Sequence, residues 1–127
     1  MNIVDSSCWL EYIAGSKVGD LVAPIIENTS ELIIPCITIY EVFKKISREL
    51  DEDKALFVVA QMKQGQVVDV DSDLAIFSGK IGLQYKLAMA DSIIYATVLK
   101  YEAVLYTQDK HFKDLKRVKY YKKIEDN

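Results

Sequence analysis

The sequence predicts an α/β fold, a three-layer α/β/α arrangement with a central parallel sheet of about five strands. Short apolar runs alternate along the chain with segments of helical periodicity, and this alternation is typical of parallel strands joined by crossover helices. Half of the 127 residues are hydrophobic, with no low-complexity tract and no linker. That length suits one domain with a core of its own, so we expect a single domain over residues 1–127.

Five apolar runs have the length and composition of buried strands. We expect them at residues 2–4, 31–35, 67–70, 103–106 and 118–121. The longest apolar run is well short of the ~20 residues that a membrane span needs. Asp5 interrupts a signal-peptide pattern at the N-terminus, so we expect a cytosolic protein.

The expected helices begin at residues that can cap them. Ser6 or Ser7 can cap a first helix, and Thr38 can cap another after Pro35. A helix is expected over residues 19–28, with Pro24 in or near its first turn. The acidic runs at residues 51–53 and 71–73 suit the starts of two further helices, so we assign them to capping rather than to metal binding.

Four acids recur where a strand ends or a helix begins: Asp5, Glu41, Asp91 and Asp109. Ligands of open α/β sheets bind beyond the carboxyl ends of the strands, so these positions are candidates for a site. Each acid taken alone has a structural alternative. Asp5 can be a simple cap or turn former, and Glu41 can complete a capping box with Thr38.

Clustered carboxylates favour a hard divalent cation. Like charges in a partly desolvated crevice either hold raised pKa values or are neutralised by a cation. A set of acids without His or Cys ligands suits Mg²⁺ or Mn²⁺ better than zinc. The chemistry such a site predicts is phosphodiester hydrolysis by a metal-activated water.

Four segments, in this order, resemble the PIN-domain family and more closely its VapC-type toxins: I-V-D-S-S-x-W-L-E-Y, I-T-I-Y-E-V, A-D-S-I-I-Y-A and L-Y-T-Q-D-K-H-F. The resemblance covers essentially the whole chain. It implies that Asp5, Glu41, Asp91 and Asp109 are the catalytic acids, with supporting roles for Ser6 and Thr107. We expect Asp5 and Asp91 to be the main metal ligands, with Glu41 and Asp109 completing the site through water.

The resemblance also implies a function. It indicates a Mg²⁺- or Mn²⁺-dependent endoribonuclease that is the toxin of a toxin-antitoxin pair, with a cognate antitoxin and a homodimeric state. A housekeeping PIN nuclease of RNA processing or decay remains an alternative, as does a binding module that kept the fold without the activity. A phosphoryl-transfer enzyme is disfavoured, because Ser7 stands where its second aspartate is needed.

Positive charge is concentrated in two places although the net charge is −3. The C-terminal group is Lys110, Lys113, Lys116, Arg117, Lys119, Lys122 and Lys123, and the second group is Lys44, Lys45 and Arg48. Such groups can hold a phosphate backbone beside an acidic site, or can be a solvated face. His111 is the only histidine, and a metal-bound water does not require it as a base.

Other side chains are assigned to packing. Cys8 and Cys36 are expected to be buried thiols rather than a disulfide or a metal pair. Most of the tyrosines fall in apolar segments and are expected in the core or in interfaces. An apolar stripe over residues 38–62 exceeds what one sheet face needs and suits an antitoxin helix or peptide; it comprises Ile39, Val42, Phe43, Ile46, Leu56, Phe57 and Val59.

Overall fold

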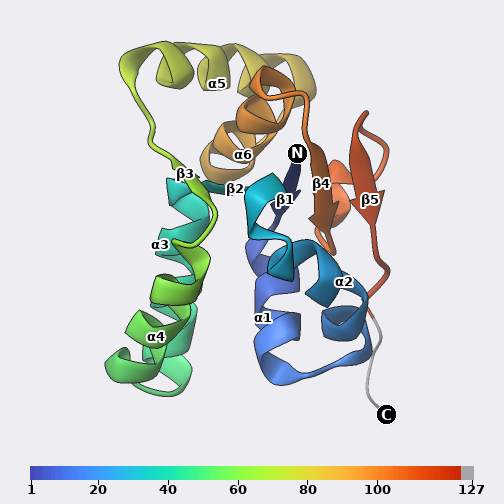
Figure 1. Cartoon of the computed structure of the whole chain (residues 1–127). Coiled ribbons are helices and arrows are strands. Elements are labelled where there is room, and N and C mark those ends of the chain that lie inside the picture. Colours follow the sequence, from blue (N-terminus) through green and yellow to red (C-terminus); the bar gives the residue numbers. More distant parts are fainter. Residues whose placement is uncertain (124–127) are drawn as a thin grey trace.

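A computed structural model describes residues 1–123 and shows a parallel five-stranded sheet between helices (Figure 1). The strands are β1 Asn2–Val4, β2 Leu32–Pro35, β3 Gln66–Val68, β4 Val104–Thr107 and β5 Val118–Tyr120. They lie in the order β3-β2-β1-β4-β5, and every neighbouring pair is parallel. The predicted α/β fold class is confirmed.

Six α-helices and two short 3₁₀ turns connect these strands. The helices are α1 Ser6–Ala14, α2 Lys17–Glu27, α3 Cys36–Glu49, α4 Glu52–Met62, α5 Ser72–Tyr85 and α6 Met89–Lys100. The 3₁₀ turns are η1 Thr29–Glu31 and η2 Lys110–Phe112. In Figure 1, α5 and α6 lie together at the top of the view, whereas α1 to α4 lie below them.

Period-two alternation along the strands divides the core into two layers. Val4 and Ile34 pack with α1 to α4 on one face of the sheet. Ile3, Ile33 and Leu105 pack with α5 and α6 on the other face. Because successive strand side chains point to opposite faces, helices cover both sides of the sheet. The carboxyl ends of β1 and β4, which are neighbours in the sheet, therefore open at the same edge.

The start of α3 differs from the prediction. The helix begins at Cys36, directly after Pro35, and Thr38 is a fully buried residue inside it. The Thr38 hydroxyl has no hydrogen-bond partner. Thr38 is therefore not the cap, and no capping box with Glu41 exists. Pro35 supplies an extended backbone from which the helix can start, and this lets the helix begin three residues earlier.

Two other predicted helix starts are wrong in detail. Helix α2 begins at Lys17 with Ser16 as its cap, so Pro24 lies inside it and not in its first turn. Asp5, rather than Ser6 or Ser7, occupies the N-cap position of α1. The caps at the acidic runs are confirmed: the side chains of Asp51 and Asp71 accept hydrogen bonds from Lys54 N and Leu74 N.

The expected apolar partner stripe is mostly core. Val42, Ile46 and Val59 are buried against the sheet or the neighbouring helices, whereas Leu56 and Phe57 remain exposed. The two thiols are free as expected; Cys8 is buried and Cys36 is half-buried. Among residues 1–123, no helix combines the length and apolar character that crossing a bilayer demands.

Candidate metal centre

Asp5 lies in the deepest part of the site, where β1 passes into α1. Its side chain is 4% exposed and makes no capping hydrogen bond to α1, the helix that it precedes. Instead the carboxylate accepts hydrogen bonds from the hydroxyls of Thr107 at 2.8 Å and Ser7 at 3.1 Å. Burial raises the pKa of Asp5, and these two hydrogen bonds partly oppose the rise. The Asp5 side chain therefore does not cap α1, which rules out the capping alternative for this residue.

The same two hydroxyls hold the loop that follows β4. The Ser7 hydroxyl accepts from Gln108 N at 3.1 Å, and the Thr107 hydroxyl accepts from Asp109 N at 2.9 Å. Each hydroxyl thus donates to Asp5 and accepts from a backbone amide. This network fixes the positions of Asp5 and Asp109 relative to each other.

Glu41 lies on the second turn of α3, and one of its two carboxylate oxygens is buried. Its Oε1 is buried and has no hydrogen-bond partner among residues 1–123. The pKa of Glu41 is raised to about 7, first by burial and then by the charges of Asp5 and Asp91. The Ser6 side chain opposes this rise, so Ser6 lies beside Glu41. A buried carboxylate oxygen without a donor is a position that a cation can satisfy.

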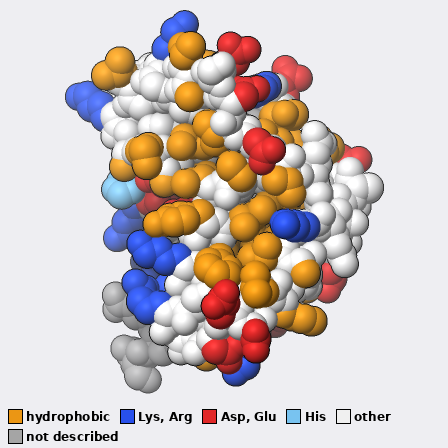
Figure 2. All heavy atoms as spheres, turned by 90° about the vertical axis from the view of Figure 1, so that its left-hand side faces the viewer, with side chains coloured by type: hydrophobic (Ala, Val, Ile, Leu, Met, Phe, Trp, Pro, Cys, Tyr) orange, Lys and Arg blue, Asp and Glu red, His pale blue; other side chains and the backbone are white. Residues whose placement is uncertain are grey.

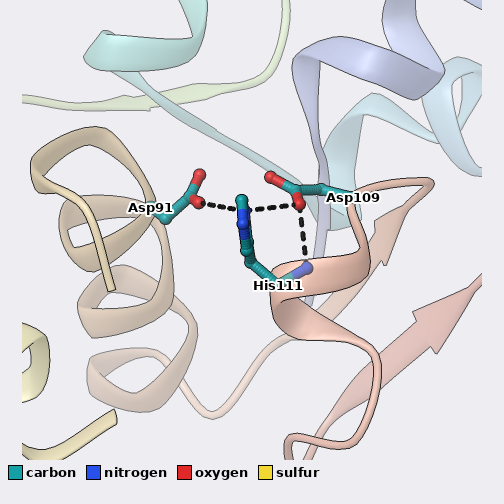
Figure 3. Close-up of side chains that lie close together, drawn as sticks. All are labelled: Asp91, Asp109 and His111. Carbon is teal, nitrogen blue, oxygen red and sulfur yellow. Dashed lines mark hydrogen bonds and ion pairs between the residues drawn. The ribbon is translucent and has the colours of Figure 1, made fainter. Parts of the chain in front are cut away.

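Asp91 and Asp109 approach each other from opposite sides of His111 (Figure 3). Asp91 is the third residue of α6, and Asp109 caps η2 by accepting from His111 N at 2.9 Å. His111 Nδ1 lies 2.9 Å from Asp109 Oδ1 and 3.4 Å from Asp91 Oδ2. The pKa of Asp91 is raised to about 6, first by burial and then by the charges of Asp109 and Asp5. One ligand atom from each of the three residues lies within 4.8 Å of the other two.

An open cavity of about 540 Å³ adjoins these acids. Asp5, Glu41 and Asp109 line it together with Lys45 and Lys123. Figure 2 shows Lys and Arg side chains gathered on one flank of the acidic patch, below the pale blue histidine. Lys45 and Lys123 of the two predicted basic groups therefore lie beside the acids, where they can counter the repulsion of a phosphate backbone.

The geometry fits a divalent cation better than it fits an uncompensated acidic cluster. The charges of Asp5, Asp91 and Asp109 all raise the pKa of Glu41, so the four acids share one electrostatic environment. Oxygen donors and a buried unpartnered oxygen are what Mg²⁺ and Mn²⁺ bind. The structure places all four predicted acids and both predicted supporting residues in one region, but among residues 1–123 only Asp91 and Asp109 lie, with His111, within 4.8 Å of one another. Their roles as ligands and catalysts remain predictions.

Two residues of the site were not predicted. Ser7 makes the contact to Asp5, although Ser6 was expected to support that residue. His111 lies among the acids, whereas the choice of metal assumed a set of ligands without histidine. The position of Ser7, two residues after Asp5, was the available signal, because a helix-starting serine can turn its hydroxyl back onto the preceding acid.

Several solved structures with the same fold are toxins or toxin-antitoxin complexes. A toxin-antitoxin complex from Klebsiella pneumoniae matches with a TM-score of 0.77 at 20% identity, covering 93% of this chain and 95% of that chain. A DNA-bound VapBC complex from Salmonella typhimurium matches with a TM-score of 0.71 at 20% identity, covering 95% and 98%. The VapC20 toxin of Mycobacterium tuberculosis, described as cleaving the sarcin-ricin loop, matches with a TM-score of 0.69 at 15% identity, covering 86% and 92%. At these identities the likeness establishes the fold.

The family follows from the sequence itself. No curated protein sequence matches this chain significantly. The sequence model of the PIN domain does match, over residues 3–118, which span the strands β1 to β4 and all four acids. The parallel sheet, the acids at its carboxyl edge and this match lead to one conclusion: the chain belongs to the PIN-domain family.

Proposed function

We propose that this protein is a metal-dependent endoribonuclease and the toxin of a toxin-antitoxin pair. The observation that carries the proposal is the shared site of Asp5, Glu41, Asp91 and Asp109, in which Glu41 Oε1 is buried without a partner. A water held by a bound divalent cation would donate a hydrogen bond to that oxygen, and the cation would offset the repulsion among the acids.

Each residue of the site has its own proposed role. Asp5 and Asp91 would hold Mg²⁺ or Mn²⁺ directly, and Glu41 and Asp109 would complete the site through water. Thr107 and Ser7 keep the Asp5 carboxylate in place, so little reorganisation is needed when the substrate arrives. When bound, the ion would supply Lewis acidity and would lower the pKa of a water beside the phosphodiester.

Positive side chains beside the acids support a nucleic-acid substrate. Lys45 and Lys123 line the cavity that contains Asp5, Glu41 and Asp109. Without such charges the acidic site would repel the phosphates on either side of the scissile bond. With them, the backbone of a bound RNA can cross the cavity while one phosphate faces the acids.

The toxin assignment is supported by the structural relatives and by an exposed apolar groove. The Klebsiella pneumoniae and Salmonella typhimurium relatives are toxin-antitoxin and VapBC complexes. A groove of about 380 Å³ between α1, α3 and α4 is lined by Ile13, Ile46, Leu50 and Phe57. We assign this groove to the cognate antitoxin, as the binding site for an apolar helix or extended peptide.

A second apolar surface supports a homodimer. Ile76, Leu83 and Met89 are 62%, 85% and 76% exposed on the α5–α6 side of the molecule. A cavity of about 480 Å³ lies on the same side and includes Leu83 and Met89. Figure 2 shows apolar side chains in a nearly continuous band across this face. Contiguous apolar patches of this kind mark association surfaces in folded proteins.

Cleavage of RNA by the purified protein tests the proposal. We expect cleavage with Mg²⁺ or Mn²⁺, loss of cleavage in EDTA, and loss of cleavage in the Asp5→Asn variant with its fold retained by circular dichroism. Asp20→Asn is the matched control, because Asp20 is exposed on α2 and contributes nothing to the site. Equal cleavage by the Asp5→Asn variant and the parent would refute the assignment.

The same experiments separate the alternatives. A toxin should arrest growth when it is expressed alone, and co-expression of the neighbouring gene should relieve the arrest; a housekeeping PIN nuclease should cleave RNA without arresting growth. A non-catalytic binding module should show neither cleavage nor a shift of melting temperature with metal.

A further inference from the structure

His111 is the only histidine of the chain, and its ring lies between two of the four acids (Figure 3). Nδ1 is 2.9 Å from Asp109 Oδ1 and 3.4 Å from Asp91 Oδ2. The other aromatic ring nitrogen of the chain is the indole N–H of Trp9, which is a donor only and cannot bind a cation. The His111 ring therefore adds one nitrogen donor to a set of carboxylate oxygens.

The turn that carries His111 is anchored on both sides. Asp109 caps η2 by accepting from the backbone N–H of His111 at 2.9 Å. Phe112, the next residue, is fully buried and packs against Tyr95 of α6, with the ring centroids 6.4 Å apart. The backbone of His111 is thus held at the edge of the site, while its side chain remains 74% exposed and can adjust its orientation at little desolvation cost.

A nitrogen donor changes which ion the site prefers. Mg²⁺ binds carboxylate and water oxygens almost exclusively, whereas imidazole is a good ligand for the first-row transition ions. Mn²⁺ accepts both carboxylate oxygen and imidazole nitrogen. The ligand atoms of Asp91, Asp109 and His111 lie within 4.8 Å of one another, close enough that an ion bound to Asp91 can also contact His111, with Asp109 reached through a bound water.

We propose that His111 is a ligand of the divalent ion at this centre and that it makes the site prefer Mn²⁺ over Mg²⁺. This inference deepens the proposed function and rests on it only in one respect, namely that the site binds a divalent ion. It does not depend on the substrate or on a toxin role. It replaces the expectation of an oxygen-only site, in which the two ions would be nearly interchangeable.

Calorimetric titration of the metal-free protein with Mn²⁺ or Mg²⁺ tests the preference. Because a lost donor near a metal typically costs about 10-fold to 100-fold in affinity, we expect His111→Ala to weaken Mn²⁺ binding by about 10-fold or more. Mg²⁺ binding should change by less than about 3-fold, since oxygen donors dominate its affinity. Lys110→Ala is the matched control, because Lys110 is exposed on the same turn and should alter neither affinity.

A spectroscopic readout separates a ligand from a residue that only orients the acids. Electron spin-echo spectroscopy of the Mn²⁺-loaded protein should show coupling to an imidazole ¹⁴N nucleus, and the coupling should vanish in His111→Ala. The chain has one histidine, so the signal can have only one source once any histidine tag has been removed. His111→Gln, which keeps a polar side chain without an imidazole, should also lack the coupling.

The outcomes distinguish this inference from the proposed function. Mn²⁺ bound without nitrogen coupling, or equal losses of Mn²⁺ and Mg²⁺ affinity in His111→Ala, would overturn the inference even if the protein cleaves RNA. Nitrogen coupling without RNA cleavage would support the inference and refute the ribonuclease. Failure of the parent protein to bind either ion would overturn both.

Discussion

The Thr107 hydroxyl donates a 2.8 Å hydrogen bond to the Asp5 carboxylate, joining the end of β4 to the end of β1 across 102 positions of sequence. The same hydroxyl accepts from Asp109 N at 2.9 Å. One side chain therefore sets the positions of two of the four acids, and the parallel pairing of β1 with β4 makes this contact possible.

Replacing Thr107 by Val should weaken both the fold and the site. The variant keeps the side-chain shape but removes a donor to a buried carboxylate, so the free energy of unfolding should fall by about 1–3 kcal/mol. RNA cleavage should fall by about 10-fold or more, as it does when a residue that orients a metal ligand is lost. Urea unfolding and RNA cleavage measure the two effects.

Thr97→Val is the matched control for that variant. Thr97 is equally buried, and its hydroxyl donates to Ile93 O at 2.8 Å inside α6, away from the acids. We expect its effect to be confined to stability. If both variants lost cleavage to the same extent, Thr107 would have no special role in the site.

The stability of the metal-free protein should decrease as the pH rises through the neutral range. The pKa of Glu41 is raised from 4.5 to about 7, and that of Asp91 from 3.8 to about 6. A folded-state pKa above the unfolded value means that ionisation costs the folded state more. The stabilising contribution is complete below the unfolded values and is lost as the pH rises through about 6 to 7. Melting temperatures between about pH 5 and pH 8 should record this loss.

The Glu41→Gln variant should show a smaller decrease over the same range, because an amide at position 41 does not ionise. Glu27→Gln, an exposed position at the end of α2, should retain the decrease of the parent. Mg²⁺ or Mn²⁺ should raise the melting temperature of the parent most at the higher pH values, where the acids are ionised. Identical pH profiles for all three proteins would contradict the assigned role of Glu41 burial.

The packing of α5 on α6 should tolerate no side chain at Gly82. A Cβ at that position would lie 2.7 Å from Ser92 Oγ, which is held by hydrogen bonds to Ala88 O and Leu87 O next to Asp91. Gly82→Ala should therefore cost about 1–3 kcal/mol of unfolding free energy. Gly79→Ala, with nothing within 4 Å, should instead stabilise α5 by about 0.5–1 kcal/mol. Thermal unfolding of both variants measures these two changes, and equal changes in the free energy of unfolding would contradict the prediction.

Phe57 should be a main contact of the proposed antitoxin. Its side chain is 76% exposed and lines the groove between α1, α3 and α4. Phe57→Lys should weaken binding of the neighbouring gene product by about 10-fold or more, because exposed aromatics that become buried dominate interface energies. RNA cleavage by the free protein should be unaffected. Leu83→Lys, on the α5 surface, is the control: it should leave antitoxin binding intact and reduce self-association.

Local sequence was sufficient to predict the order of strands and helices. Short apolar runs predicted all five strands within a few residues, and Asp51 and Asp71 cap the helices that their acidic runs indicated. The four acids could also be chosen from sequence, because their positions at strand ends or helix starts follow from the same patterns. These features depend on neighbours within a few residues, so the sequence contains them directly.

Competing local patterns misled the prediction where packing decided the outcome. The pattern Thr38-x-x-Glu41 has the form of a capping box, yet α3 begins at Cys36 and buries Thr38. The side chains of Val42 and Ile46 were assigned in part to a partner surface, although they are buried in the core layer that includes α1 and α4. Burial against another helix outweighs a local capping preference of about 1 kcal/mol.

The sequence by itself determined the fold class and the caps at Asp51 and Asp71, and it selected the four acids as candidates. Only the tertiary structure decided that Ser7 and Thr107 donate hydrogen bonds to Asp5. It also decided that Glu41 Oε1 is buried without a partner among the described residues, and that His111 lies between Asp91 and Asp109. The physical reason is distance along the chain. Backbone preferences act between residues a few positions apart, whereas these contacts join residues that meet only when parallel strands align their carboxyl ends.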